Sequence, residues 1–153
     1  MKNYSFLWLL LFILIAEGAG FLGLFFIGSV DGWYTTLSKA ALTPPSWLFG
    51  PVWAILYALI GSAAYLVWRQ KSDGNVLRLY WIQLAANTVW TPLFFGLQNP
   101  ELALIDIAIL FVLIVLTIVA FGRIHKLAGI LLIPYLLWVG FATYLNVMVV
   151  LLN

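Results

Sequence analysis

The sequence predicts an all-α membrane protein, a single domain formed by a five-transmembrane-helix bundle over residues 1–153. Composition is the first reason: 65% of the residues are hydrophobic and 8% are charged, whereas roughly a quarter of a soluble domain is charged. A soluble chain of this length could not bury so much apolar surface. The second reason is five nearly uncharged runs, each reaching the roughly 20 residues that a membrane-crossing helix needs. They lack the alternation of transmembrane β-strands.

Each predicted span is bounded by residues that begin or end helices. The spans are expected at about 5–28, 46–68, 77–98, 101–122 and 127–151, with an outer loop at 29–45. Pro100 and Glu101 suit the start of the fourth span, because an acid is favourable at a helix N-terminus. Pro92 and Pro134 lie inside the third and fifth spans and predict kinks there.

The distribution of Lys and Arg predicts the orientation of the bundle. With five spans, six basic residues fall on the side of the N-terminus, and Lys39 alone falls on the other side. Basic residues mark the cytoplasmic side, so we expect a bacterial inner-membrane protein with a cytoplasmic N-terminus. Because the charges flank apolar spans, the net charge of +2 indicates membrane topology and no nucleic-acid partner. The six residues are Lys2, Arg69, Lys71, Arg78, Arg123 and Lys126.

An aromatic, proline-rich stretch at 43–57 opens the second span. Proline is tolerated at a helix start, so its three prolines predict a rigid helix entry. Trp53 and Tyr57 are one turn apart and therefore share a helix face, while Trp47 suits an anchor at the membrane surface. The preceding loop contains Tyr34, and two interpretations of that loop stay open: a lid over a binding site or an aromatic anchor.

Polar and aromatic residues form a stripe at helical spacing in the third span, and the fifth span repeats the pattern. In lipid, small and polar residues turn toward the bundle interior. The stripes indicate either a cavity wall that orients and stacks a ligand or hydrogen bonds between neighbouring helices. Their tryptophans favour the cavity. The residues are Gln83, Asn87, Trp90, Thr91 and Phe94 in the third span, and Trp138, Phe141, Ala142, Leu145 and Asn146 in the fifth.

Ionisable residues within the spans form no catalytic constellation. Glu17 lies at the centre of the first span, and the small residues around it favour close helix packing over an ionisable site. Asp106, near the start of the fourth span, is a helix N-terminal acid or a group at the mouth of a pocket. The chain has no Cys, and its one His, His125, lies in a charged hinge. We therefore expect neither a metal site nor a nucleophile–His–acid triad.

Three blocks of sequence contain five of the six prolines and four of the eight tryptophans of the chain. They read Pro44-Pro45-x-Trp47-x-Phe49-Gly50-Pro51-Val52-Trp53-x-x-Leu56-Tyr57, Asn87-x-x-Trp90-x-Pro92-Leu93-Phe94-Phe95-Gly96, and Pro134-Tyr135-Leu136-x-Trp138-x-x-Phe141-Ala142-x-x-Leu145-Asn146. In this order they resemble the signature of the translocator protein family, whose members are also called tryptophan-rich sensory proteins or peripheral-type benzodiazepine receptors. The resemblance covers roughly residues 33–146.

The resemblance implies a five-helix bundle, a homodimer, and a pocket that opens toward the first loop. Family members bind porphyrins and synthetic isoquinoline- or benzodiazepine-type ligands, and some bind cholesterol. Some bacterial members promote light-dependent breakdown of protoporphyrin IX with two tryptophans, which correspond here to Trp53 and Trp138. The sequence departs from the family where Lys39-Ala40-Ala41-Leu42 replaces Lys-Pro-x-Trp. No Lys or Arg follows Tyr144, so we do not expect cholesterol as the natural ligand.

The leading hypothesis is a membrane receptor or carrier that binds tetrapyrroles and isoquinoline- or benzodiazepine-type ligands in an aromatic pocket within the bundle. Membrane lipid is the other expected partner of the protein. An enzyme that degrades protoporphyrin IX in light is the alternative, and a ligand-free regulatory or structural subunit is the third. No cofactor is expected; porphyrin is ligand or substrate. The expected ligand-binding residues are Tyr34, Trp53, Tyr57, Gln83, Asn87, Trp90, Phe94, Trp138, Phe141, Ala142 and Leu145.

Overall fold

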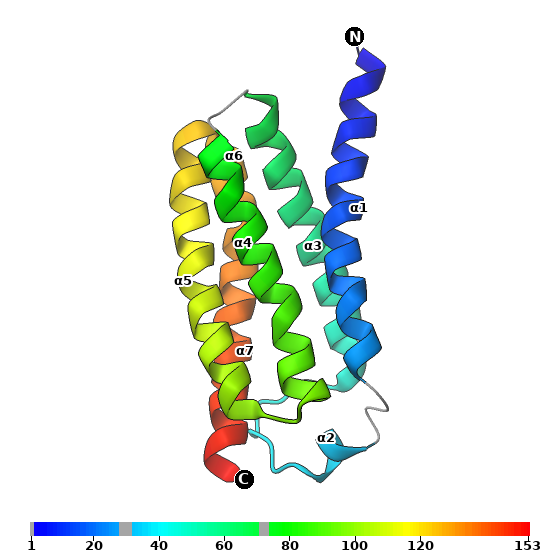
Figure 1. Cartoon of the computed structure of the whole chain (residues 1–153), viewed down its shortest axis with the longest axis vertical. Helices are drawn as coiled ribbons and strands as arrows, with labels where there is room; N and C mark the ends of the chain where they lie inside the picture. The colour runs from blue at the N-terminus through cyan, green and yellow to red at the C-terminus, as the bar shows by residue number, and fades with distance from the viewer. Residues whose placement is uncertain (1, 28–31, 71–73) are drawn as a thin grey trace.

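Helices make up all the regular secondary structure in the part of the chain that the structure, a computed structural model, describes. That part comprises residues 2–27, 32–70 and 74–153, with side chains described from residue 6 onward. The long helices run side by side along the longest axis, with α2 at the same end as the C-terminus (Figure 1). The elements are α1 (Lys2–Ile27), α2 (Trp33–Thr36), α3 (Ser46–Arg69), α4 (Gly74–Thr91), the π-helix η1 (Pro92–Gly96), α5 (Pro100–Ile124), α6 (Lys126–Leu131) and α7 (Ile133–Leu152).

Four stretches within the described ranges are long and apolar enough to cross a membrane. They are Phe6–Ile27, Ser46–Arg69, Pro100–Ile124 and Lys126–Leu152, the last formed by α6 and α7 together. Leu, Ile, Val and Phe cover much of their outer surface, as expected for helices that face lipid. The protein is therefore an integral membrane protein of the all-α class, as predicted. The predicted third span, which contains α4, is the one that does not meet these criteria.

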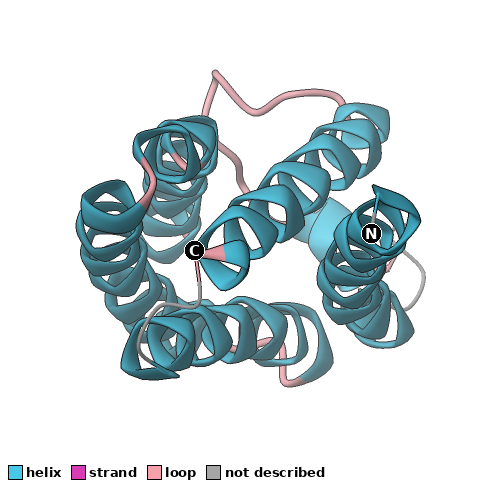
Figure 2. Ribbon diagram, turned by 90° about the horizontal axis from the view of Figure 1, so that it is seen from above, coloured by secondary structure: helices cyan, strands magenta, loops and turns pink. Residues whose placement is uncertain are grey.

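Polar residues explain why α4 differs from the other long helices. Gln83 and Asn87 are 1% and 5% exposed, and Thr88 is half-buried. Together with Asn75 and Arg78 near its start, these side chains lower the hydropathy of the helix, yet Gln83 and Asn87 point into the bundle and not at lipid. Viewed from the end, the long helices form one bundle (Figure 2), and α4 contacts α1, α3 and α5 within it.

Proline interrupts the helical hydrogen-bond pattern at both predicted positions. At Pro92, α4 gives way to η1, and the Leu97 N–H donates to the Pro92 carbonyl at 2.8 Å, five residues back. The fifth predicted span is divided at Leu132, between α6 and α7, two residues before Pro134. Pro lacks an N–H and clashes with the preceding turn, which accounts for both interruptions. Asn99 then caps α5 by accepting the Leu102 N–H at 2.9 Å.

Small residues bring α1 against α3. A Cβ added at Gly61 would lie 2.6 Å from the Phe12 carbonyl oxygen and 2.6 Å from the Ile13 Cα atom. Nearby, the rings of Trp8 and Trp68 pack with centroids 4.9 Å apart. The helices α1 and α3 are thus closely packed at this level, and glycine is required where the two backbones approach most closely.

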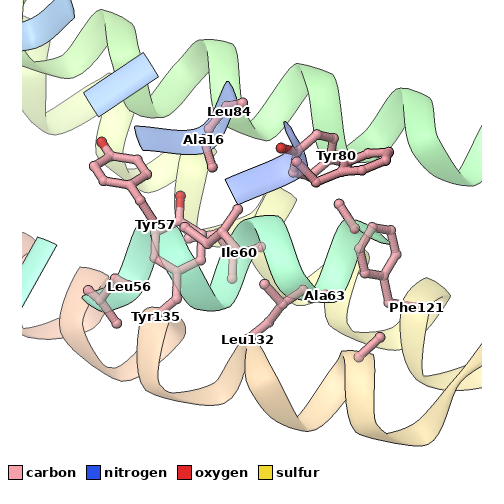
Figure 3. Close-up of a cluster of buried hydrophobic side chains, with 14 of the residues drawn as sticks. Ala16, Leu56, Tyr57, Ile60, Ala63, Tyr80, Leu84, Phe121, Leu132 and Tyr135 are labelled. Carbon is pink, nitrogen blue, oxygen red and sulfur yellow. The ribbon is translucent and has the colours of Figure 1, made fainter. Parts of the chain in front are cut away.

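The hydrophobic core runs through the middle of the bundle. Ile60, Ala63, Tyr80, Phe121 and Tyr135 are each fully buried and come from four different helices (Figure 3). Because lipid provides no hydrophobic force between helices, this core depends on close van der Waals packing. This core fills the part of the bundle that lies farther from α2 than the cavity described in the next subsection.

Replacing Gly61 by Ala should lower the stability of the bundle. The new methyl group would meet the backbone of α1, which has to move, and overpacking of this kind costs about 1–3 kcal/mol. Gly122→Ala is the control, because nothing lies within 4 Å of a Cβ at that position. The midpoint of thermal unfolding in detergent should fall for Gly61→Ala only. Equal midpoints for the two variants would contradict the close approach of α1 and α3.

Candidate ligand-binding cavity

A cavity of about 720 Å³ lies between α1, α3, α4, η1, α5 and α7, beneath α2. Its size is in the range of small-molecule sites, which measure roughly 300–1,000 Å³. Nine of the predicted ligand-binding residues line it: Tyr34, Trp53, Tyr57, Asn87, Trp90, Phe94, Trp138, Ala142 and Leu145. Gln83 and Phe141 do not line it. The role of these residues in binding a ligand stays a prediction.

Aromatic rings from several helices form the walls. Trp53 stacks on Tyr57, with centroids 5.4 Å apart and planes 30° apart. Trp90 stacks on Phe94 at 4.9 Å and 21°. These pairs follow from the sequence, because residues four positions apart on a helix share a face. Paired rings hold one another in place, so the walls are preformed.

A chain of hydrogen bonds forms the floor of the cavity and joins α3, α4 and α7. The Tyr57 hydroxyl donates to Asn87 Oδ1, and Asn87 Nδ2 donates to the Tyr135 hydroxyl at 2.8 Å. The Tyr135 hydroxyl donates in turn to Gln83 Oε1 at 2.9 Å. Both tyrosine rings project from their helices toward α4 (Figure 3). Gln83 therefore forms hydrogen bonds between neighbouring helices, which was the alternative interpretation of the polar stripe. Asn87 belongs both to the network and to the cavity wall.

A second set of hydrogen bonds fixes the wall formed by Trp90. Its indole Nε1–H donates to Asn146 Oδ1 at 3.1 Å, and Asn146 Nδ2 donates to the Pro100 carbonyl at 2.8 Å. Asn146 is 2% exposed and lines the cavity. It stood in the sequence stripe but not among the expected ligand-binding residues. Phe141 packs beside the cavity instead, with its ring 5.7 Å from that of Trp138.

The mouth of the cavity is covered by α2 and the segment that follows it. Tyr34 packs on Phe95 with centroids 5.5 Å apart, and Lys39 Nζ lies 4.6 Å from the centre of the Tyr34 ring. Burial raises the pKa of the Tyr34 hydroxyl above its usual range. This placement favours the lid interpretation for the described part of the loop; residues 28–31 lie outside the described ranges. Trp47 is 72% exposed, as an interfacial anchor would be.

Two hydrogen bonds attach this lid to the end of α7. The Ser38 N–H donates to Asn153 Oδ1 at 2.9 Å, and Asn153 Nδ2 donates to the Ser38 carbonyl at 3.0 Å. Within the atypical segment that follows Lys39, Ala40 is buried, whereas Leu42 is 69% exposed. The Asn153 side chain therefore holds the lid at Ser38, just before the segment in which the resembled family has Pro and Trp.

The model of the TspO/MBR family matches residues 11–152. The chain belongs to the TspO/MBR family. It is 45% identical over 144 residues to "Tryptophan-rich protein TspO" of Archaeoglobus fulgidus, covering 92% of this chain and 94% of that protein. It is 43% identical to the protein of the same name from Chlorobaculum tepidum, over 99% of both chains. "Translocator protein" of Homo sapiens is 40% identical over 119 residues, covering 74% of this chain and 70% of that protein.

Several cavity residues of this TspO/MBR chain escaped the sequence reasoning. Glu17, Gly20 and Gly23 of α1 line the cavity, together with Phe49 of α3. A Cβ at Gly20 would fall within 2.1 Å of the Tyr57 ring, so this glycine makes room for a cavity-wall side chain. The spacing of 17, 20, 24 and 27 on one helical face was the available signal. In the described ranges, no group of three or more His, Asp or Glu is placed to hold a metal.

The hydrogen-bond network at the cavity floor should show strong coupling in a double-mutant cycle. Asn87→Leu leaves the hydroxyls of Tyr57 and Tyr135 without this partner, and a buried orphan costs about 1–3 kcal/mol. Tyr57→Phe should therefore destabilise the wild type more than it destabilises the Asn87→Leu variant. Unfolding midpoints of the four proteins in detergent measure this coupling. Additive effects of the two substitutions would mean that the bond does not contribute to stability.

Proposed function

We propose that this TspO/MBR-family protein is a membrane receptor or carrier that binds tetrapyrroles in the cavity. The observation that carries the proposal is that Trp53, Trp90 and Trp138, from three different helices, line one cavity. Flat aromatic ligands stack on indole rings, and a few fixed polar groups such as Asn87 orient them. Synthetic isoquinoline- and benzodiazepine-type molecules fit the same description. The names of the relatives, translocator and tryptophan-rich sensory protein, are in accord with ligand handling.

We further propose that α4 and η1 together make a fifth crossing. They contribute 18 and five residues, which at about 1.5 Å per residue is enough for the hydrocarbon core of a bilayer. The two termini lie at opposite ends of the molecule (Figure 1), as an odd number of crossings requires. The distribution of Lys and Arg places the N-terminal end in the cytoplasm and the lid outside.

A homodimer is part of the proposal, since the family resemblance implies one. The surface between α1 and α4 has an open apolar groove of about 600 Å³, lined in part by Gly18, Ala19 and Ala85. Small residues allow helices of two copies to approach closely. Chemical cross-linking in the native membrane addresses the assembly separately from ligand binding.

Titration with protoporphyrin IX tests the binding proposal. In zwitterionic lipid nanodiscs, the wild type should shift the porphyrin absorption band saturably, and Trp138→Ala should weaken the affinity about tenfold or more through loss of a stacking face. Trp47→Ala is the matched control, because Trp47 is an exposed indole that does not line the cavity. Equal affinities for the two variants would contradict the proposed site. If neither porphyrins nor isoquinolines raise the unfolding midpoint, the ligand-free subunit is the better interpretation.

Light-dependent breakdown of protoporphyrin IX is a second candidate, favoured by the stacking of Trp53 on Tyr57 beside Trp138 in one cavity. Here the porphyrin absorbs the light, and the tryptophans donate electrons or trap reactive oxygen. At saturating porphyrin in air, illumination should bleach the porphyrin band faster with the wild type than with Trp53→Phe/Trp138→Phe. Trp47→Phe should behave like the wild type. Equal bleaching rates for the wild type and the double variant leave binding as the function.

A further inference from the structure

The cavity carries one carboxyl group and no basic side chain among the described residues that line it. Glu17 of α1 supplies that carboxyl. Lys39 does not line the cavity, but its Nζ lies 4.6 Å from the centre of the ring of Tyr34, which does. Glu17 is ten residues before the end of α1 at Ile27, about 15 Å from that end along the helix axis. The cavity is therefore acidic, and a basic group lies just outside it, beyond Tyr34.

The polar groups nearest to Glu17 are committed elsewhere. Tyr57 shares the cavity with Glu17, but its one O–H donates to Asn87. Asn87 and Tyr135 pass their hydrogen bonds on toward Gln83, away from α1. In the described part of the chain, no group donates a hydrogen bond to the Glu17 carboxyl. A carboxyl group in the middle of a membrane without a partner is costly, and such residues mark functional sites.

Close helix packing, the alternative explanation for this region, does not account for Glu17 itself. Gly20 and Gly23 do make close contacts, with Tyr57 and Thr91. A Cβ at Gly18, the residue after Glu17, would meet nothing within 4 Å. Gly18 borders both the open groove between α1 and α4 and the cavity, whereas Glu17 lines the cavity alone. The Trp138 indole N–H, which also lines the cavity, has no partner either. An acceptor that faces a cavity and receives no hydrogen bond is open to a donor that arrives with a ligand.

We infer that Glu17 is a specificity-determining residue, which selects planar aromatic ligands that carry a protonated nitrogen or an N–H group. The inference rests on the proposed function, in that it takes the cavity to be a ligand site, and it names the chemistry that the ligand must present there. Glu17 also orients the ligand: the nitrogen-bearing part faces α1, and any carboxylate faces Lys39 beyond Tyr34. A molecule with both groups would match the two ends of the cavity.

Three tricyclic probes of similar shape test this inference: the cation 9-aminoacridine, neutral acridine and the anion anthracene-9-carboxylate. Binding to the full chain in zwitterionic nanodiscs is followed by probe fluorescence, with subtraction of protein-free nanodiscs. The wild type should bind the cation about tenfold more tightly than acridine and the anion most weakly. Glu17→Gln, which keeps the shape and removes the charge, should bind the cation about tenfold less tightly. Its affinity for acridine should be unchanged, which also verifies that the cavity is intact.

Glu101→Gln is the matched control, because it removes the same charge from an exposed site at the start of α5, outside the cavity. This variant should keep the wild-type preference for the cation. Equal binding of the three probes by the wild type, a preference that persists in Glu17→Gln, or one lost equally in Glu101→Gln would each overturn the role of Glu17. Protoporphyrin titration of the same preparations separates the two proposals: porphyrin binding without cation selectivity refutes only the inference, and the converse refutes only the tetrapyrrole assignment.

Discussion

The structure depends on one constraint: in a bilayer, a buried polar group without a partner in the protein is costly. The bonds from Tyr57 to Asn87, Tyr135 and Gln83 pair both tyrosine hydroxyls and the oxygens of both amides across three helices, and leave Gln83 Nε2 without a partner. They fix the relative depth of α3, α4 and α7, and with it the height of the cavity floor. The tryptophans above the floor then meet around a defined volume, since each belongs to a helix whose register is already set.

Much of the fold could be predicted because membrane crossing imposes simple requirements of length and hydropathy. Those requirements identified four stretches that the structure bears out, and helix chemistry predicted the start of α5 at Pro100 and the interruptions near Pro92 and Pro134. The third predicted span is the exception, because two residues of the network at the cavity floor, Gln83 and Asn87, reduce the hydropathy of α4 together with Asn75 and Arg78. A hydropathy rule treats Gln83 and Asn87 as penalties, whereas the bundle buries and pairs them.

The cavity was predictable in part. Helical periodicity shows which face of a span turns inward, and it brought Asn87, Trp90 and Phe94 together correctly. It does not show depth within the bundle or which neighbour a side chain meets, and so it could not separate Gln83, in the network, from Asn87, on the wall. For α1 the difficulty was greater, since the small residues around Glu17 are also typical of closed helix packing. Only the space left in front of Glu17 distinguishes the two situations.

The two bonds between Ser38 and Asn153 have a mechanical consequence. They connect the lid to α7, which also carries Trp138 and Asn146 on the opposite wall of the cavity. The lid and the wall formed by α7 are thus connected directly. A movement of α7 or of the lid that is not shared by the other would have to break both bonds. The position of the lid and the position of this cavity wall are consequently coupled through one asparagine side chain.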